Sequence, residues 1–192
     1  MKVLIILYFL FTSIQSNIIY VKNDTFEVLY SEELEQPLEV KYEVKCISNI
    51  FSRKGLDFHK VDGINTSDDL DYVNNFYDKG HLAPAGSFNC NEKMLIETFS
   101  YLNCALQRQE LNRGVWKYLE NHERVLAQRY KVNVIVKCVF SKNSIRLKTG
   151  ATIPDAFYKE IYYDNKVEIY YFPNEVPKYR KYINYKIENP LK

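Results

Sequence analysis

One histidine, His81, lies in a segment whose residue types suit proton transfer. It follows Asp78, Lys79 and Gly80, and Pro84 comes three residues later. Gly80 lets the backbone bend or approach a ligand closely, the two charged residues flank the imidazole, and Pro84 excludes a helix interior. An imidazole with an unperturbed pKa of about 6.5 is mostly neutral at pH 7 and accepts a proton from water. We therefore interpret His81 as a candidate general base, the alternative being a purely structural histidine.

Two segments after His81 show helical periodicity. Residues 91–99 carry apolar side chains at helical spacing, and Asn89 or Asn91 is suited to cap the start. Residues 111–129 predict a longer helix with an apolar stripe. One side of this helix carries a residue of interest every fourth position, at Asn112, Trp116, Glu120 and Arg124.

Strand patterns precede and follow these helices. Residues 38–50 alternate apolar and polar side chains, which predicts a strand that leads to Arg53. Residues 132–140 and 160–172 are rich in β-branched and aromatic side chains and predict further strands, the second interrupted by a turn at Asp164-Asn165. The acidic stretch 57–75 predicts a loop. The proline-containing tail is expected to be only partly ordered.

The composition limits the classes of function. With 192 residues, 46% hydrophobic and 26% charged, the chain fits one globular domain. A formal net charge of +2 excludes a strongly basic protein that binds nucleic acid through its overall charge. Affinity for phosphates must come from a local cluster of Lys and Arg.

The first residues have the pattern of a secretory signal peptide: Lys2, an apolar run from Val3 to Phe11, and small or polar residues to Ser16. The run is too short to cross a bilayer, and no membrane span is predicted later in the chain. We therefore expect a signal peptide over residues 1–16, a domain over residues 17–192, and secretion. The alternative for the N-terminal run is a buried strand.

Four cysteines, Cys46, Cys90, Cys104 and Cys138, permit up to two disulfides in an exported protein, with three possible full pairings. The sequence does not choose among them. It contains no Cys-x-x-Cys motif or His/Cys cluster with zinc spacing, so no structural zinc is predicted. Glycosylation sequons begin at Asn23 and Asn65.

Three motifs resemble those of the DNA/RNA non-specific endonuclease family. Residues 77–84, YDKGHLAP, resemble its signature, whose usual form is Asp-Arg-Gly-His. Residues 98–120, TFSYLNCALQRQELNRGVWKYLE, resemble its Ser-Asn-x-x-Pro-Gln followed by Leu-Asn-x-x-x-Trp and Leu-Glu, with every interval preserved and Arg124 extending the match. Residues 152–159, TIPDAFYK, resemble a third motif, and Arg53 stands where the family keeps an upstream arginine.

The resemblance implies an α+β fold of the ββα-metal (His-Me finger) type, with a central, mostly antiparallel sheet and flanking helices. It also implies a hydrolase that cuts DNA and RNA internally with little sequence specificity, leaves 5′-phosphate ends, and depends on Mg²⁺, with Mn²⁺ as a possible substitute. Roles carried over from the family are a general base at His81 and a direct metal ligand at Asn112. A phosphate clamp is implied at Arg53, and Asn103 would orient the histidine loop. Glu120 and Arg124 would support the site.

Departures from the family pattern concern Lys79, which replaces the usual arginine and loses its bidentate fork, and Leu102 and Leu106, which replace serine and proline. Substrate binding is expected at Lys79, Arg113 and Arg124. A wider phosphate track would comprise Lys54, Lys79, Arg108, Arg113 and Lys117, whose alternative is a solvated surface. Two other functions stay open at this point: a nucleic-acid-binding protein that has lost turnover, and a disulfide-stabilised interaction domain. DNA or RNA preference and oligomeric state are not predicted.

Overall fold

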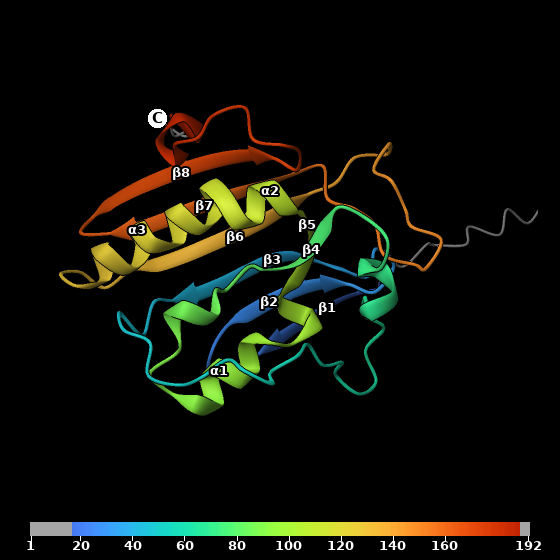
Figure 1. Ribbon diagram of the computed structural model, residues 1–192, viewed down its shortest axis with the longest axis horizontal. Coiled ribbons are helices and arrows are strands. Elements are labelled where there is room, and N and C mark those ends of the chain that lie inside the picture. The colour runs from blue at the N-terminus through green and yellow to red at the C-terminus, as the bar shows by residue number, and fades with distance from the viewer. Residues whose placement is uncertain (1–16, 189–192) are drawn as a thin grey trace, which may run out of the picture.

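Seven antiparallel strands form the main sheet of the structure, a computed structural model that describes residues 17–188 (Figure 1). A separate pair of antiparallel strands, β4 (Tyr77–His81) and β5 (Cys104–Arg108), forms a second, two-stranded sheet. In spatial order the strands of the main sheet are β1 (Ile18–Lys22), β2 (Glu27–Ser31), β3 (Gln36–Glu43), β6 (Asn133–Val139), β7 (Ala156–Tyr163), β8 (Lys166–Pro173) and β9 (Lys186–Ile187).

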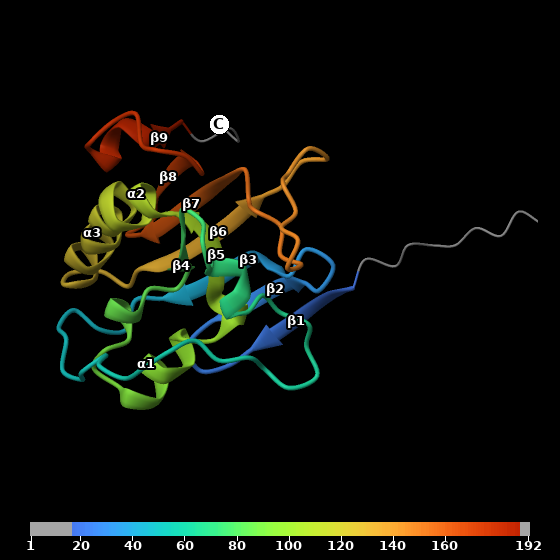
Figure 2. The ribbon, with the colours of Figure 1, turned by 45° about the vertical axis from the view of Figure 1, so that its right-hand side comes forward.

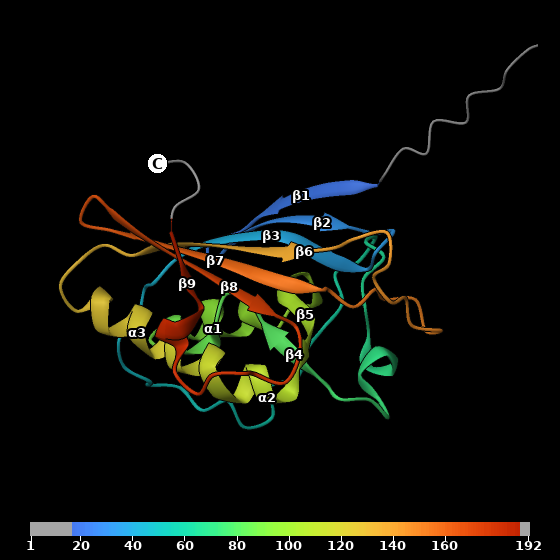
Figure 3. The same cartoon turned by 90° about the horizontal axis from the view of Figure 1, so that it is seen from above.

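The helices and the small sheet lie on one face of the main sheet (Figure 3). They are α1 (Glu92–Thr98), α2 (Gln109–Leu111) and α3 (Lys117–Ala127), and a π-helical turn over Asn112–Trp116 joins α2 to α3. Short 3-10 helices span Asp69–Tyr72, Ala85–Ser87, Tyr101–Asn103 and Tyr182–Tyr185. The architecture confirms the predicted α+β class with an antiparallel sheet.

The core lies between the main sheet and the α2–α3 segment. Trp116 is fully buried and meets the rings of Phe157 on β7 and Phe172 on β8 edge to face, each with centroids 5.5 Å apart. Truncating a buried aromatic side chain of this size costs about 3–5 kcal/mol. Because Trp116 ends the π-helical turn that begins at Asn112, its packing anchors this turn to the sheet.

The strands predicted over 132–140 and 160–172 are confirmed as β6, β7 and β8. The turn at Asp164 and Asn165 is also confirmed, and both residues have left-handed backbone angles, φ 46° and 56°. Such angles are typical of a two-residue hairpin turn whose twist matches that of the strands. The strand predicted over 38–50 is too long, because β3 ends at Glu43. Beyond it, the amides of Lys45 and Cys46 donate to the Ser87 carbonyl, at 3.0 and 2.9 Å, instead of to a neighbouring strand.

The predicted helices differ in how regular they are. The helix predicted over 91–99 is confirmed as α1, and Asn91 caps it by accepting from the Met94 amide at 3.1 Å. Asn89 instead accepts from the amides of Ile50 and Phe51. The helix predicted over 111–129 begins at Gln109 and ends at Ala127, and it is not one continuous α-helix, since Gly114 interrupts it with φ −104° and ψ −115°.

One disulfide is present among the described residues, between Cys46 and Cys90, while Cys104 and Cys138 are buried free thiols. The disulfide ties the segment that leads to Arg53 to the start of α1. The tail is more ordered than expected up to residue 188, with a 3-10 helix and β9. The proposed signal peptide, residues 1–16, lies outside the described residues. No helix within residues 17–188 is long and apolar enough to span a membrane.

Candidate active site

The residues that the sequence motifs pointed to meet in one cavity of about 280 Å³ between α3 and the segment that follows β4. Six of the eight predicted site residues line it, whereas Asn103 lies beneath it and Lys79 is not among the lining residues. The cavity is lined by Arg53, His81, Pro84, Ala85, Gly86, Asn112, Arg113, Lys117, Glu120 and Arg124.

His81 is the last residue of β4, and its ring is held between two phenylalanines. The ring centroids of Phe58 and Phe99 lie 4.7 and 4.9 Å from that of His81. Nε2 of His81 is buried without a hydrogen-bond partner among the described atoms, so Nδ1 is the nitrogen available to the cavity. Burial, together with the positive charge of Arg53, lowers the pKa of His81 to about 3. The imidazole is therefore neutral at neutral pH.

Asn103 fixes the backbone that follows His81. Its side chain is fully buried, accepts from the Ala83 amide at 2.7 Å and donates to the Ala83 carbonyl at 2.8 Å. A third bond runs to the Thr98 carbonyl, at 2.9 Å. Because one side chain satisfies both backbone groups of Ala83, the loop after the histidine has little freedom to move.

The Asn112 side chain is oriented by Asp78, which in the sequence stands out only as a charged residue near His81. The Asn112 Nδ2 group donates to Asp78 Oδ2 at 2.9 Å, which leaves Oδ1 of the amide available to the cavity. Asp78 also accepts two bonds from Arg113, at 2.8 and 2.6 Å. The carboxylate of Asp78 thus holds both the amide and the neighbouring guanidinium.

Two guanidinium groups approach each other over Gly86. A Cβ atom at position 86 would lie 2.9 Å from Arg124 Nη1 and 3.2 Å from Arg53 Nη2, so a larger residue would displace the end of at least one of these side chains. Neither guanidinium has a carboxylate within 4 Å in the part of the chain that the structure describes. Arg124 donates to the neutral side chain of Asn121. The two arginines therefore bring positive charge to the cavity outside any ion pair, and the nearby acidic residue that acts on them through space is Glu120.

Glu120 lies on the same wall of the cavity, one helical turn before Arg124. Burial raises the pKa of Glu120 to about 7, an effect that Lys159 and Arg124 partly offset. Behind it, Lys159 on β7 forms a fully buried ion pair with Glu123, at 2.8 Å, which also accepts from the Tyr42 hydroxyl at 2.6 Å. This buried network attaches α3 to strands β3 and β7 and supports the cavity wall from below.

The sequence predicted that Lys79 binds substrate, but its side chain is not among those that line the cavity. Its amine contacts Asp69 and Asp57, the latter at 3.0 Å, and lies above the rings of Phe58 and Tyr101, at 5.6 and 5.5 Å from their centroids. These carboxylates, with the Tyr101 hydroxyl, raise the pKa of Lys79 against the opposing effect of burial. The charge is therefore compensated locally and turned toward the 57–72 loop.

Gly80 has a different reason for its small size than the sequence suggested. A Cβ atom at this position would lie 2.6 Å from Gln107 Cβ on the paired strand β5 and 3.2 Å from the Ala105 carbonyl oxygen. Its backbone does not adopt a left-handed angle. Gly80 is needed for close packing within the β4–β5 pair, and not for a bend or for the approach of a ligand.

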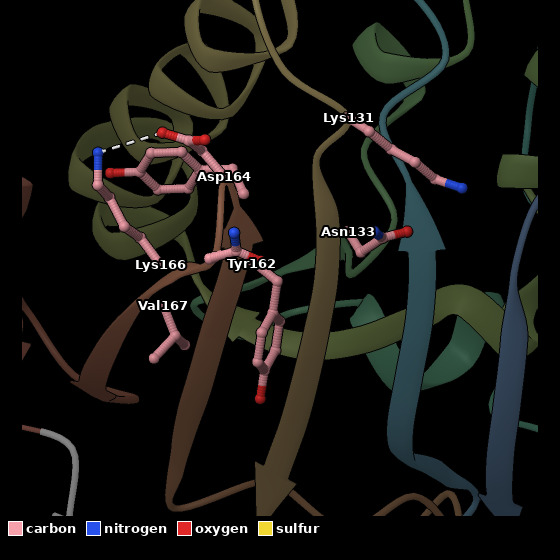
Figure 4. Close-up of a pocket in the computed structure, with 8 residues that line it drawn as sticks. Lys131, Asn133, Tyr162, Asp164, Lys166 and Val167 are labelled. Carbon is pink, nitrogen blue, oxygen red and sulfur yellow. Dashed lines mark hydrogen bonds and ion pairs between the residues drawn. The ribbon is translucent and has the colours of Figure 1, made fainter.

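A second hollow, of about 460 Å³, opens at the β7–β8 turn and next to the start of β6 (Figure 4). Lys131 and Lys166 line it, and they pair with Glu43 and Asp164 at 3.0 and 3.3 Å. No histidine or cysteine is among its lining residues. It therefore lacks the base and the free cations that the first cavity combines.

The family model described as DNA/RNA non-specific endonuclease matches residues 10–189. The chain belongs to this family. Members of the family are metal-dependent nucleases, and the described residues contain no cluster of three or more His, Cys, Asp or Glu able to hold a metal ion. A metal in this cavity would therefore have fewer than three such ligands from the described residues.

Mitochondrial nucleases are among its relatives. The chain is 34% identical to mitochondrial endonuclease G of Bos taurus over 88 residues, which are 44% of this chain and 29% of that protein. It is 31% identical to the mitochondrial nuclease of Saccharomyces cerevisiae over 102 residues, which are 53% of this chain and 26% of that protein. These matches thus span less than a third of the relatives' length.

The fold agrees with that of a solved relative. A chain in the crystal structure of the EndoG/EndoGI complex superposes with a TM-score of 0.79 and 25% identity, covering 88% of this chain and 80% of that one. This match confirms the ββα-metal fold.

The prediction of secretion is wrong. Endonuclease G and EXOG, as well as the yeast relative, are named as mitochondrial nucleases. An apolar N-terminal run followed by small residues is a pattern of composition, and it does not by itself identify the compartment.

Proposed function

We propose that the protein is a metal-dependent phosphodiesterase that cuts DNA and RNA internally with little sequence specificity. The observation that carries the proposal is the meeting, in one cavity, of a neutral histidine, an oriented amide oxygen and two arginines without carboxylate partners. Membership of the endonuclease family supports it. The names of the relatives support a mitochondrial place of action.

His81 is the proposed general base. Its Nδ1 takes a proton from a water molecule, whose oxygen attacks phosphorus as the bond to the 3′-oxygen breaks. That route leaves a 5′-phosphate on one product. Phe58 and Phe99 hold the ring in place, and Asn103 holds the loop behind it. Because the pKa of His81 is low, its protonated form passes the proton on readily after the attack.

Asn112 is the proposed protein ligand of Mg²⁺, through Oδ1. The donor set fits this metal, which prefers oxygen ligands and keeps several waters, so one amide oxygen and a substrate phosphate suffice. When bound, the metal ion stabilises negative charge on the departing 3′-oxygen. Mn²⁺ is a proposed substitute. Asp78 orients the amide, so that oxygen and not nitrogen faces the cavity.

Arg53 and Arg124 are the proposed phosphate-binding groups, and Arg113 and Lys117 line the cavity beside them. Guanidinium groups match the geometry of phosphate oxygens in a bidentate manner. Glu120 is placed to adjust the field around the two arginines, to which it is electrostatically coupled. Lys79 is not part of the proposed phosphate site, because Asp57 and Asp69 hold its amine.

The test is digestion of plasmid DNA and of RNA with Mg²⁺, with and without a chelator. We expect both substrates to be cut, the chelator to abolish cutting, and His81→Ala to lose at least about 10²–10⁴-fold in rate, the range for removal of a general base. Asn112→Ala should lower the apparent affinity for Mg²⁺. His59→Ala is the matched control, since His59 is exposed and lines neither hollow described above.

The sequestered Lys79 favours one second candidate, a protein on the same scaffold that binds nucleic acid without turning it over. Binding of an oligonucleotide without cleavage under any divalent ion would support it and overturn the nuclease. Cleavage by His81→Ala at the wild-type rate would leave the nuclease standing and refute the assignment of the base.

A further inference from the structure

The segment that follows β8 is basic and rich in tyrosine. Residues 177–187, here called the C-terminal segment, contain four basic residues, three tyrosines and no acidic residue. Lys186 pairs with Glu168 at 3.0 Å. The other three, Lys178, Arg180 and Lys181, are exposed and have no carboxylate within 4 Å in the described part of the chain. Their charges are therefore free to act on an external anion.

Aromatic packing holds this segment in a fixed place. Tyr182 stacks on His122 of α3, with ring centroids 5.4 Å apart, and Tyr185 stacks on Phe172 of β8 at 4.8 Å. The Tyr185 hydroxyl accepts from the Tyr179 amide at 2.9 Å, which closes the segment on itself. The cations thus stand on a folded surface, which lowers the entropy lost when they bind a ligand.

The C-terminal segment lies along the helices that carry the proposed active site (Figure 2). Lys178 and Tyr179 share a hollow of about 260 Å³ with Leu111, the residue directly before Asn112. Lys117 lines the active-site cavity, and the neighbouring side chain, Tyr118, is 54% exposed. Glu175 is the acidic residue of the hollow. Tyr118 lies one helical turn before His122, on the face of α3 against which Tyr182 of the segment stacks.

We propose that the C-terminal segment is a second contact surface for nucleic acid, where Lys178, Arg180 and Lys181 bind backbone phosphates on one side of the cut. The inference rests on the proposed nuclease function. With a net charge of only +2, the protein cannot attract a polyanion through its overall charge, so affinity has to come from such local groups. Tyr118 and the 42% exposed Tyr179 offer rings on which unpaired bases stack.

The test measures binding separately from cleavage, in a His81→Ala background so that the probe stays intact. The triple variant Lys178→Gln, Arg180→Gln, Lys181→Gln is titrated against a labelled single-stranded oligonucleotide by fluorescence anisotropy at several salt concentrations. Each phosphate contact contributes about 0.7 to the slope of log affinity against log salt for single strands, so three contacts predict a slope shallower by about 2. Because the two affinities converge near about 1 M salt, this slope difference corresponds to a loss of affinity on the order of a hundredfold at about 0.1 M salt.

A matched control removes three charges elsewhere. Lys142→Gln, Arg146→Gln, Lys148→Gln changes exposed residues in the loop between β6 and β7, which packs beside Tyr72 and Tyr77 at the end of β4 away from His81. This control should bind as the background protein does. Both triples keep the aromatic anchors of the fold, and thermal unfolding checks that they are folded.

If both triple variants lose the same affinity for the oligonucleotide, only the net charge of the protein matters. If the salt dependence of binding is unchanged in the C-terminal triple variant, the segment makes no phosphate contact. Either result overturns this inference. If wild-type protein still cuts DNA and RNA, the proposed nuclease function survives that result. If the wild type cuts neither and the background protein binds neither, the proposed function fails first.

Discussion

Two pairs of cations stand near His81, and they differ in what surrounds them. Arg53 and Arg124 meet over Gly86, line the cavity and have no carboxylate within 4 Å among the described residues. Lys79 and Arg113 are each held by carboxylates, Lys79 by Asp57 and Asp69, and Arg113 by Asp78. A motif match treats all four as phosphate-binding candidates, whereas their neighbours separate them.

The neighbours of each cation indicate which cations bind substrate and which hold the site in shape. A compensated charge gains little from a phosphate, because binding it means giving up the carboxylate. Lys79 instead ties the loop that carries Phe58 to β4, and Phe58 packs against the His81 ring. A partly desolvated guanidinium outside any ion pair has no carboxylate to give up, so its field acts on the substrate.

The strongest test of the comparison is Arg53→Ala. Removal of one preorganised charge that faces a developing anion costs about 10²–10³-fold in rate, and we expect kcat/KM for plasmid cleavage to fall by this factor. Arg53→Lys should recover part of it, since charge returns without the bidentate fork. Arg146→Ala, a change at an exposed arginine in the loop between β6 and β7, is the control. A loss below about fivefold would mean that free cations are not the ones that bind phosphate.

Asp78→Ala and Arg113→Ala together test what the carboxylate of a paired cation does. Asp78 accepts from both Asn112 and Arg113, so removal of its carboxylate should leave the Asn112 amide free to rotate. We expect about 10–100-fold lower activity, the range known for groups that orient metal ligands, and a weaker apparent affinity for Mg²⁺. Arg113→Ala keeps the bond to Asn112 and should lose much less. Equal losses in activity and metal affinity would show that the ion pair itself matters.

Gly86→Ala tests the close approach of the two free arginines. Its added Cβ would press on the Arg124 guanidinium at 2.9 Å, and position 86 has no left-handed backbone angle that would strain alanine. We expect about tenfold lower kcat/KM, because a small displacement of a positioning group costs this much or more. The midpoint of thermal unfolding should change little. Full activity would show that the pair tolerates separation.

Motif spacing predicted the convergence of His81, Asn112, Arg53, Glu120 and Arg124 on one cavity. Motif spacing is informative here because the β4–β5 pair and the helix that follows it fix the distances between the motif residues. The paired or free state of each cation was not predictable. It depends on Asp57 in a loop and Asp69 at the start of a short 3-10 helix, neither of which belongs to a periodic sequence pattern. It also depends on Gly86, whose small size matters only when two distant arginines meet over it.

The elements of the fold also divide into those that local sequence patterns predicted and those that they did not. Strands β6, β7 and β8 were predicted from strong β-branched and aromatic patterns, as was the turn at Asp164 and Asn165. The strands β1 and β2 were missed, because β1 is a half-exposed edge strand whose pattern resembles a polar leader. The predicted end of β3 was too late in the chain. The amides of Lys45 and Cys46 donate to the carbonyl of Ser87, which lies 44 positions after Glu43 and is not visible in a local pattern.

Lys79→Ala should have the smallest effect on catalysis. We expect kcat/KM to fall by less than about threefold and unfolding free energy to fall by about 1 kcal/mol or less, since both carboxylate partners are exposed. Hydrogen bonds from Lys79 lower the pKa of Asp57 and Asp69 below their ordinary 3.8.

The lowered pKa values of Asp57 and Asp69 determine the pH range in which wild type and Lys79→Ala differ in stability. The stability contributed by the Lys79 contacts is fully present above the ordinary pKa of the two aspartates and is lost as the pH falls through their lowered values. Urea unfolding of wild type and Lys79→Ala should therefore differ at pH 7 and converge at acidic pH. Lys79→Arg keeps the charge and should resemble the wild type. A loss of activity in Lys79→Ala as large as that of Arg53→Ala, with an unchanged fold, would mean that the amine leaves its carboxylates to reach substrate. The difference between cations that bind phosphate and cations that hold the site in shape would then apply only to the protein without nucleic acid.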